Sequence, residues 1–306
     1  MTARALVVAM GWILPGLVSA QSPATSISRD SLAHVLLRSG VDTATMGVLV
    51  YYARGSESHA RELGTMLAEN LRYYRDSLGV DLDPDLALAL VDSVQWRLAT
   101  KRTFGLPFYH GGYRVLFLPS TPIGPDAEAF LPLESRAPAA SMATVQRQHR
   151  SWSKGVARML DLILLHEVGH VVVGRLKIEP PNRWFNEWLA TSLAYSFMRS
   201  EHPDDAQLWD AMCNADLAVY TPQHRTLADF ERGGLANDDY VWYESAFQPR
   251  VRAIYEAHGL RFIRALRTEF GTAVSPPAPA ELLARLDRVA PGFKDWAART
   301  FGDPPR

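Results

Sequence analysis

The stretch LDLILLHEVGHVVVG, residues 160–174, is apolar on nearly every side of a helix and carries one polar motif, His166-Glu167-Val168-Gly169-His170. So apolar a run predicts a buried helix, which we expect to extend over 156–174. Residues four apart share a helix face, so His166 and His170 can direct both imidazoles at one point. Burying these groups without partners would be strongly unfavourable, and a metal ion removes that objection. The other reading is that both histidines are core or surface residues.

Glu167 is rotated by about 100° from His166 around the helix axis. It can therefore reach a water molecule on the metal without ligating the metal itself. Metal-assisted hydrolysis needs this division, in which two neutral nitrogens hold the cation and a separate carboxylate takes the proton from the metal-bound water. Cys213 is the only cysteine, which excludes an intrachain disulfide and a zinc site built mainly of thiolates. The sequence thus predicts a Zn²⁺ site with Glu167 as general base.

A tetrahedral zinc that keeps one open position needs a third protein ligand. The segment WFNEWLA, residues 184–190, offers Glu187, which comes 17 positions after His170. This spacing allows a loop and a second helix packed antiparallel to the first. The apolar neighbours of Glu187 would leave an unpartnered carboxylate poorly solvated. The alternative is a carboxylate near a helix N-terminus that interacts with the helix dipole.

HEVGH followed at short range by WFNEWLA resembles the gluzincins, a group of zinc metallopeptidases that includes the thermolysin-like proteases and the membrane-alanyl-type aminopeptidases. The spacer is shorter than in those two branches and is more similar to the secreted peptidase-MA-like proteins. The resemblance covers about 145–270. It implies a zincin-like fold, with His166, His170 and Glu187 as zinc ligands and Glu167 as general base.

The segment VWYESA, residues 241–246, is similar to an aminopeptidase stretch in which a tyrosine stabilises the oxyanion. The resemblance gives this role to Tyr243, with Tyr240 as a substitute, whereas the other reading is a core aromatic residue. Two positions depart from the family pattern. Trp188 replaces a common Gly and should narrow or reshape the nearby cleft, and Thr191 replaces an Asp that supports a zinc-bound His in the thermolysin branch. The segment that binds a free α-amino group in the aminopeptidases is missing, which argues against aminopeptidase action.

Residues 1–20 read as a signal peptide with cleavage near Ala20, because Arg4 precedes an apolar run that ends in small residues. This predicts a secreted or periplasmic protein without a stable membrane span after cleavage. The other reading of the run is a membrane anchor. A net charge of −1 and the lack of basic clusters give no indication of a nucleic-acid partner.

The predicted fold class is α+β, with a small mixed sheet and helices in the N-terminal portion, 21–144, and a mostly helical zinc-binding catalytic portion, 145–306. In the first portion we expect a helix at 56–78 and strands at 46–53, 86–91 and 113–118. A turn-prone stretch lies around 105–112. In the second portion we expect helices over 156–174, 184–199, 205–219, 240–258, 260–270, 279–289 and 291–301. Pro249 should kink or divide the helix at 240–258. The stretch SPPAPA, 275–280, reads as a linker between helices.

Taken together, the residues predict a secreted zinc metallopeptidase of the gluzincin type that acts on a peptide or protein substrate. The strand at 113–118 is the candidate for pairing with an extended peptide. One alternative is a non-catalytic secreted binding or scaffold protein that retains the gluzincin fold, with or without zinc. Another is a zinc hydrolase of a non-peptide amide. The sequence sets neither the cleavage specificity nor the oligomeric state.

Overall fold

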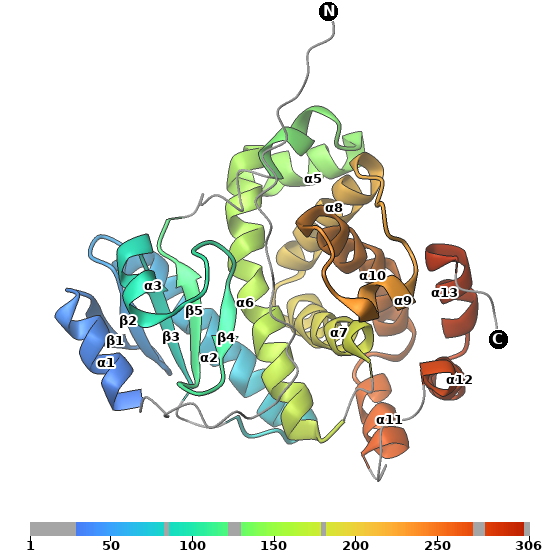
Figure 1. The fold of residues 1–306 in the computed structure, drawn as a ribbon, viewed down its shortest axis with the longest axis horizontal. Coiled ribbons are helices and arrows are strands. Elements are labelled where there is room, and N and C mark those ends of the chain that lie inside the picture. Colours follow the sequence, from blue (N-terminus) through green and yellow to red (C-terminus); the bar gives the residue numbers. More distant parts are fainter. Residues whose placement is uncertain (1–28, 83–85, 122–129, 179–181, 272–278, 303–306) are drawn as a thin grey trace, which may run out of the picture.

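The computed structural model describes residues 29–82, 86–121, 130–178, 182–271 and 279–302. The protein is of the α+β class, with a small mixed sheet in the N-terminal half and a mostly helical C-terminal half (Figure 1). This confirms the predicted fold class. The predicted signal peptide and most of the SPPAPA segment lie outside the described residues.

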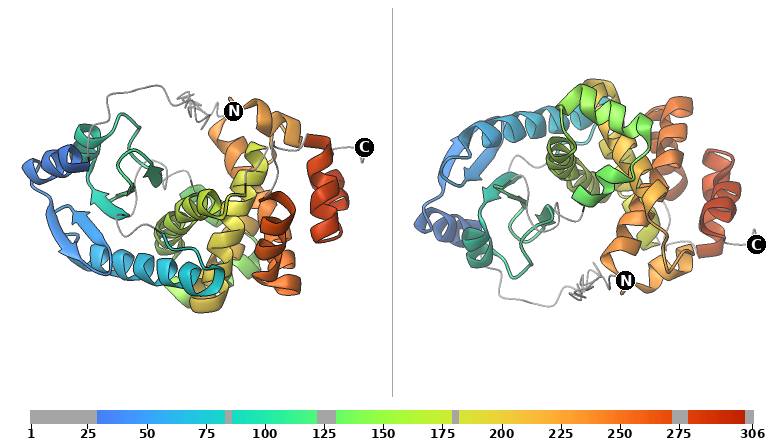
Figure 2. Two further views of the ribbon diagram at one scale, coloured as in Figure 1. Left: turned by 90° about the horizontal axis from the view of Figure 1, so that it is seen from below. Right: turned by 90° about the horizontal axis from the view of Figure 1, so that it is seen from above.

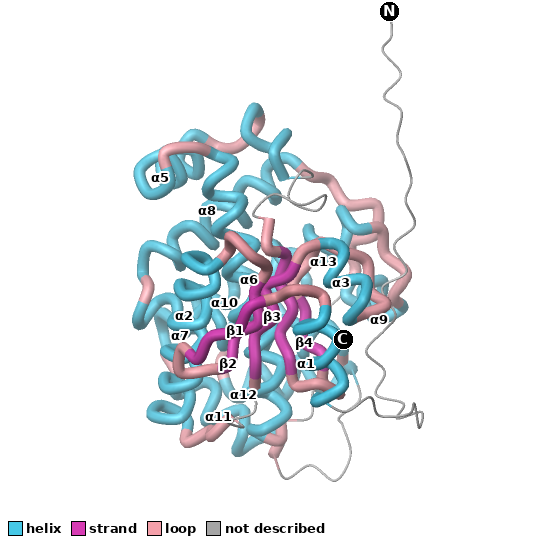
Figure 3. The backbone as a smooth tube through the Cα atoms, turned by 90° about the vertical axis from the view of Figure 1, so that its left-hand side faces the viewer, coloured by secondary structure: helices cyan, strands magenta, loops and turns pink. Residues whose placement is uncertain are grey.

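The sheet has five described strands in the order β1-β2-β3-β5-β4: β1 (Asp42–Thr45), β2 (Leu49–Tyr52), β3 (Ala87–Val91), β4 (Phe108–His110) and β5 (Val115–Pro119). The three central strands are parallel, and β1 and β4 pair antiparallel at the edges. Figure 3 looks onto these strands, with the helical portion behind them. Since parallel strands are buried on both faces, this sheet needs cover on each side.

Alternate residues of the central strands supply the two faces of the sheet. Leu88 and Leu116 face the main core, to which α2 (Glu57–Leu78) and α6 (Trp152–Leu176) contribute. Ala89 and Phe117 face a smaller core, which is covered by α1 (Arg29–Arg38) and α3 (Ser93–Ala99). α6 therefore lies between the sheet and the other C-terminal helices, as both views in Figure 2 show.

Helices form the rest of the described chain after Phe130, beginning with the short 3-10 helix η1 (Leu131–Ser135). α7 packs against α6, α8 and α10, and both of its long faces are buried. The helices and their bounds, besides α6, are α5 (Ala139–His149), α7 (Arg183–Glu201), α8 (Pro203–Val219), α9 (Leu227–Arg232), α10 (Asn237–His258), α11 (Arg261–Phe270), α12 (Pro279–Val289) and α13 (Phe293–Phe301). Among the described residues, none of the helices combines the length and apolar character needed to cross a membrane.

Three local predictions need correction. The expected strand at 46–53 is shorter, since only Leu49–Tyr52 is extended as β2; residues 46–48 form the turn from β1, where the φ of +80° at Gly47 suits glycine. The turn-prone stretch at 105–112 contains β4, which antiparallel pairing with β5 holds extended. Pro249 was expected to kink or divide its helix; α10 is not divided, since Phe247 and Val251 are buried on both sides of the proline, and a kink stays a prediction.

Candidate metal centre

The two helices that carry the predicted ligands touch at one glycine. A Cβ added to Gly169 would lie 2.5 Å from the carbonyl oxygen of Ala190 and 2.9 Å from its Cα. Only a residue without a side chain permits so close an approach of α6 and α7. Because Gly169 precedes His170 and Ala190 follows Glu187 by three positions, this contact brings the predicted ligands of both helices together.

The three predicted ligands converge on one point. Nε2 of His166 and Nε2 of His170 each lie 3.1 Å from Oε2 of Glu187, and the two nitrogens are also 3.1 Å apart. His166 and Glu187 are buried, with 8% and 6% of their surfaces exposed. Three ligand atoms at the corners of a nearly equilateral triangle are thus supplied by two turns of α6 and one turn of α7.

The charges at this triangle support one another. Burial lowers the pKa of His170, but the adjacent Glu187 carboxylate outweighs it and raises this pKa to about 9. Burial also disfavours the charged form of Glu187, yet His170 and the hydrogen bonds from both imidazoles hold the pKa of this carboxyl well below its usual range. Without a metal ion, a protonated His170 would therefore balance the charge of the buried Glu187 carboxylate.

The triangle fits a zinc ion. Its centre lies about 1.8 Å from each corner, close to the usual Zn–N and Zn–O distances of about 2.0–2.2 Å, so the three residues could hold such an ion together. Two imidazoles and one carboxylate are a donor set of catalytic zinc sites, in which a fourth position stays open. Such an ion would also replace the positive charge of the His170 proton.

Glu167 lies beside the triangle, and its Oε2 accepts a hydrogen bond of 3.0 Å from the backbone N–H of Tyr109 in β4. Ligand atoms of Glu167, His166 and His170 all lie within 4.8 Å of one another. The carboxylate is therefore near the proposed ion and is oriented by the edge strand of the sheet. This position is the one that the sequence predicts for a general base.

The two candidate tyrosines of α10 differ in position. Tyr243 is fully buried, its hydroxyl donates to the backbone carbonyl of Thr226 at 2.6 Å, and its ring stacks on Phe301. Tyr240 lies one turn earlier, where burial and the negative charges of Glu187, Glu244 and Glu167 raise the pKa of its hydroxyl well above the ordinary value. The structure thus places Tyr240 within the field of the carboxylates at the centre, whereas the hydrogen bond to Thr226 and the ring contact with Phe301 place Tyr243 in the core.

Contacts to the outer nitrogens of the histidine ligands are not evident from the sequence, and the structure supplies one for His166. Its Nδ1 lies 3.1 Å from the hydroxyl oxygen of Thr191, which in turn donates to Oε2 of Glu244 at 3.5 Å. Burial, and next the Glu187 charge, raise the pKa of Glu244 to about 7. Glu244 was not predicted from the sequence, and the signal for it was a carboxylate inside the apolar stretch VWYESAF.

Trp188, the large residue at a position where the family commonly has Gly, was expected to narrow the nearby cleft. It is fully buried instead, and its ring stacks on Phe185 and meets Phe262 and Phe293 edge-on. This residue fills the core behind α7. The expectation about the cleft is therefore wrong.

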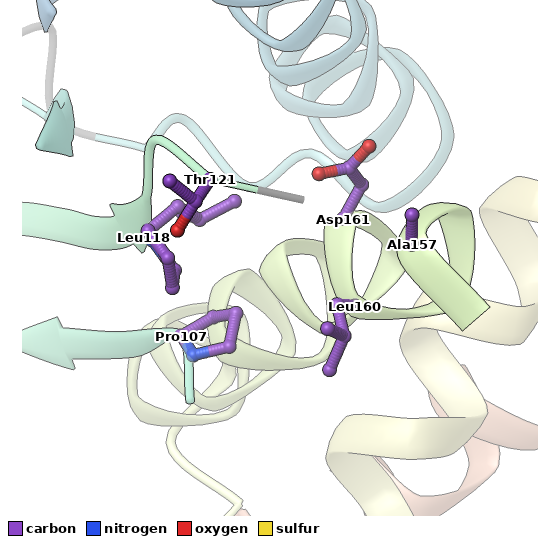
Figure 4. A pocket seen from close by; sticks show the side chains of 7 residues that line it. Pro107, Leu118, Thr121, Ala157, Leu160 and Asp161 are labelled. Atoms are coloured by element: carbon purple, nitrogen blue, oxygen red, sulfur yellow. The ribbon is translucent and has the colours of Figure 1, made fainter. Parts of the chain in front are cut away.

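A small, shallow pocket lies between the start of β4, the end of β5 and the N-terminal half of α6. Figure 4 shows Pro107 and Leu118 on one side and Leu160 and Asp161 on the other. The Asp161 carboxylate lies 2.9 Å from Nε2 of His59. Asp161 precedes Glu167 by six residues, about 9 Å along the helix axis, so the pocket and the metal centre lie along one helix.

Two imidazoles and three carboxylates therefore gather where α6, α7, α10 and β4 meet. The predicted ligands and the predicted base are all present in this group, and Tyr240 joins them from α10. Comparison of the chain with models of protein families, with curated proteins and with solved structures gave no match in any of the three.

Proposed function

We propose that the protein is a secreted zinc-dependent hydrolase of peptide bonds, a metallopeptidase of the gluzincin type with a zincin-like arrangement of its helices. The observation that carries this proposal is the 3.1 Å triangle of His166, His170 and Glu187, with the carboxylate of Glu167 beside it. Ligands for one ion and a separate base are the two parts that metal-assisted hydrolysis requires.

His166, His170 and Glu187 would hold the ion. When bound, zinc supplies a Lewis acid that polarises a carbonyl oxygen and lowers the pKa of water. The buried surroundings of these ligands exclude bulk water, which strengthens the electrostatic interactions at the centre.

Glu167 acts as the general base in this proposal. The N–H of Tyr109 fixes one carboxylate oxygen, which leaves the other oxygen to take a proton from the attacking water. The same carboxyl group then returns the proton to the leaving nitrogen of the substrate. A carboxylate that is oriented by backbone moves little between these two steps.

Tyr240 takes the role that the resemblance gave to Tyr243. A neutral phenol that donates toward developing negative charge stabilises the transition state more than the ground state. Its raised pKa keeps this hydroxyl protonated across the physiological range. Arg183 approaches the same ring, with its guanidinium carbon 5.6 Å from the ring centroid.

The substrate would pair with β4. The strand predicted for this role, 113–118, corresponds to β5, which lies between β3 and β4 and has no open edge among the described strands. β4 is the edge strand, and it already directs the N–H of Tyr109 toward Glu167. An extended peptide that adds to this edge would cross the metal centre.

The test uses the purified protein and a broad peptide library, analysed by mass spectrometry. We expect cleavage that a chelator abolishes and zinc restores. Zinc binding without any cleavage would instead support the non-catalytic alternative, and cleavage of small amides alone would support a non-peptide substrate. The proposed secretion is tested separately, since the exported chain should begin near Gln21.

A further inference from the structure

Of the two candidate histidine ligands, only His166 has a hydrogen-bond partner, among the described residues, for Nδ1, the ring nitrogen that faces away from the triangle. Its Nδ1 lies 3.1 Å from the hydroxyl oxygen of Thr191, whereas Nδ1 of His170 is buried and has no hydrogen-bond partner among the described residues. The two ligands are therefore held differently. His170 is aligned by its helix alone, and His166 has an additional contact from α7.

The hydroxyl of Thr191 makes contacts unlike those of its neighbours on α7. Ser192 donates to the carbonyl of Trp188, and Ser196 donates to the carbonyl of Leu193, so both hydroxyls bond within their own helix. Thr191 is only 1% exposed, and its hydroxyl instead bridges α6 and α10. A buried hydroxyl that leaves its own helix for two polar partners on other helices indicates a specific role.

Glu244 is the far end of this bridge. Its Oε2 accepts the Thr191 hydroxyl, and its Oε1 is buried without a hydrogen-bond partner among the described residues. An apolar helix would be more stable with an apolar residue here, because a half-satisfied buried carboxyl group costs free energy. The cost is understandable if the carboxyl group serves the metal centre.

We propose that Thr191 and Glu244 form a hydrogen-bonded relay that positions His166 for metal binding. This inference rests on the proposed function, because it assumes that His166 ligates an ion through Nε2. Thr191 and Glu244 are positioning residues in this scheme, since they act through His166. In the thermolysin branch an Asp at the position of Thr191 contacts the histidine directly. In this protein Thr191 provides the contact, and Glu244 provides the carboxyl group behind it.

The direction of the relay follows from proton counting. When Nε2 of His166 gives its lone pair to an ion, the single ring proton must reside on Nδ1. Nδ1 then donates to the oxygen of Thr191, and the hydroxyl proton of Thr191 is left to donate to Glu244. Because the carboxyl oxygen of Glu244 accepts the last hydrogen bond, the donor and the acceptor of both bonds are determined. This fixes the tautomer and the orientation of the His166 ring.

The experiment measures the zinc dissociation constant by competition with a chromophoric chelator, on the full chain and without any substrate. Thr191→Val keeps the shape and removes the hydroxyl, whereas Thr191→Ser keeps the hydroxyl. Ser192→Ala is the matched control, since it removes a buried hydroxyl one residue away. Thermal unfolding of each metal-free variant separates loss of fold from loss of metal binding.

We expect Thr191→Val to weaken zinc binding by about 10- to 100-fold, the usual effect of removing an outer-shell partner. Thr191→Ser and Ser192→Ala should stay close to wild type. Glu244→Gln should also weaken binding, and the double variant Thr191→Val, Glu244→Gln should lose little beyond Thr191→Val, because both residues act through one chain.

Two results would overturn the relay. One is a folded Thr191→Val variant with wild-type affinity. The other is a double variant whose losses add fully, which would mean that Glu244 acts on the ion independently of Thr191. A wild-type protein that binds no zinc would refute the proposed metal centre itself, and this outcome is distinct from the first two.

Discussion

Gly169 of α6 meets the backbone of Ala190 of α7 so closely that a methyl group on Gly169 would lie 2.5 Å from the Ala190 carbonyl oxygen. This contact determines how near the imidazoles of α6 come to Glu187. The glycine within HEVGH is therefore a structural requirement of the proposed metal centre, although it carries no chemical group of its own.

The first prediction is that Gly169→Ala destabilises the protein and weakens zinc binding together. The added methyl group cannot be relieved by rotating a flexible side chain, because it collides with backbone. Such overpacking costs typically about 1–3 kcal/mol, and any outward shift of α7 also displaces Glu187. Urea unfolding of the metal-free protein and chelator competition would measure the two effects.

Gly174→Ala is the control, because it lies in the same helix and its added Cβ meets nothing within 4 Å. Removing a helical glycine should leave the stability unchanged or raise it by up to about 1 kcal/mol, with wild-type zinc affinity. A Gly169→Ala variant that matched this control in both measurements would contradict the role of the contact.

The sequence predicted the long elements well because their apolar periodicity is strong. α2, α6 and α7 begin and end within a few residues of their expected bounds. β4 was missed because three residues carry no periodicity, and only its pairing with β5 makes it a strand. Since the backbone N–H of Tyr109 in that strand binds the Glu167 carboxylate, one part of the site could not be predicted from local sequence.

The site shows a similar limit. The motif predicted His166, His170 and Glu187 because their spacing along two helices leaves little freedom. The choice between Tyr240 and Tyr243 was different, since residues three apart on a helix differ by only about 60° in direction. The packing of α10 against its neighbours decides which one faces the centre. Glu244 is 53 residues from Thr191 in sequence, and no local pattern relates the two.

The second prediction is that Glu167→Gln removes hydrolysis and leaves zinc binding intact. The amide oxygen still accepts the N–H of Tyr109, so the side chain keeps its place, but it has no basic site for a proton. We expect the turnover number to fall by about 10²- to 10⁴-fold, the usual contribution of general acid–base catalysis. Turnover of a library-derived peptide and chelator competition would be measured side by side. Wild-type turnover with normal zinc content would exclude Glu167 as the base.

The third prediction separates the two tyrosines of α10. Tyr240→Phe should lower the turnover number by about 10²- to 10³-fold, as the loss of an oxyanion donor does, and should leave the melting temperature nearly unchanged. Tyr243→Phe should lower the free energy of unfolding instead, by about 1–3 kcal/mol, because the carbonyl of Thr226 loses a buried donor. The reverse pattern would restore the role to Tyr243.

The fourth prediction concerns the pH dependence of the metal-free protein and follows from the pair of His170 and Glu187. The pKa of His170 is raised to about 9 from an ordinary value of 6.5. Its contribution to stability is therefore complete below about pH 6.5 and is lost as the pH rises through 9. The pKa of Glu187 is depressed, so its contribution is present above its ordinary value of 4.5 and is lost only in stronger acid.

Zinc must displace the proton of His170, because only the neutral imidazole offers a lone pair. We therefore expect the apparent zinc affinity to rise about tenfold per pH unit between pH 6.5 and 9 and to level off above 9. Chelator competition at several pH values, corrected for the protonation of the chelator, measures this slope. Glu187→Gln should flatten it, because loss of the carboxylate lowers the pKa of His170, although it also removes a ligand. An affinity that did not change between pH 7 and 9 in the wild type would show that no proton is held between these ligands in this range, and His170 would then be neutral before the ion arrives.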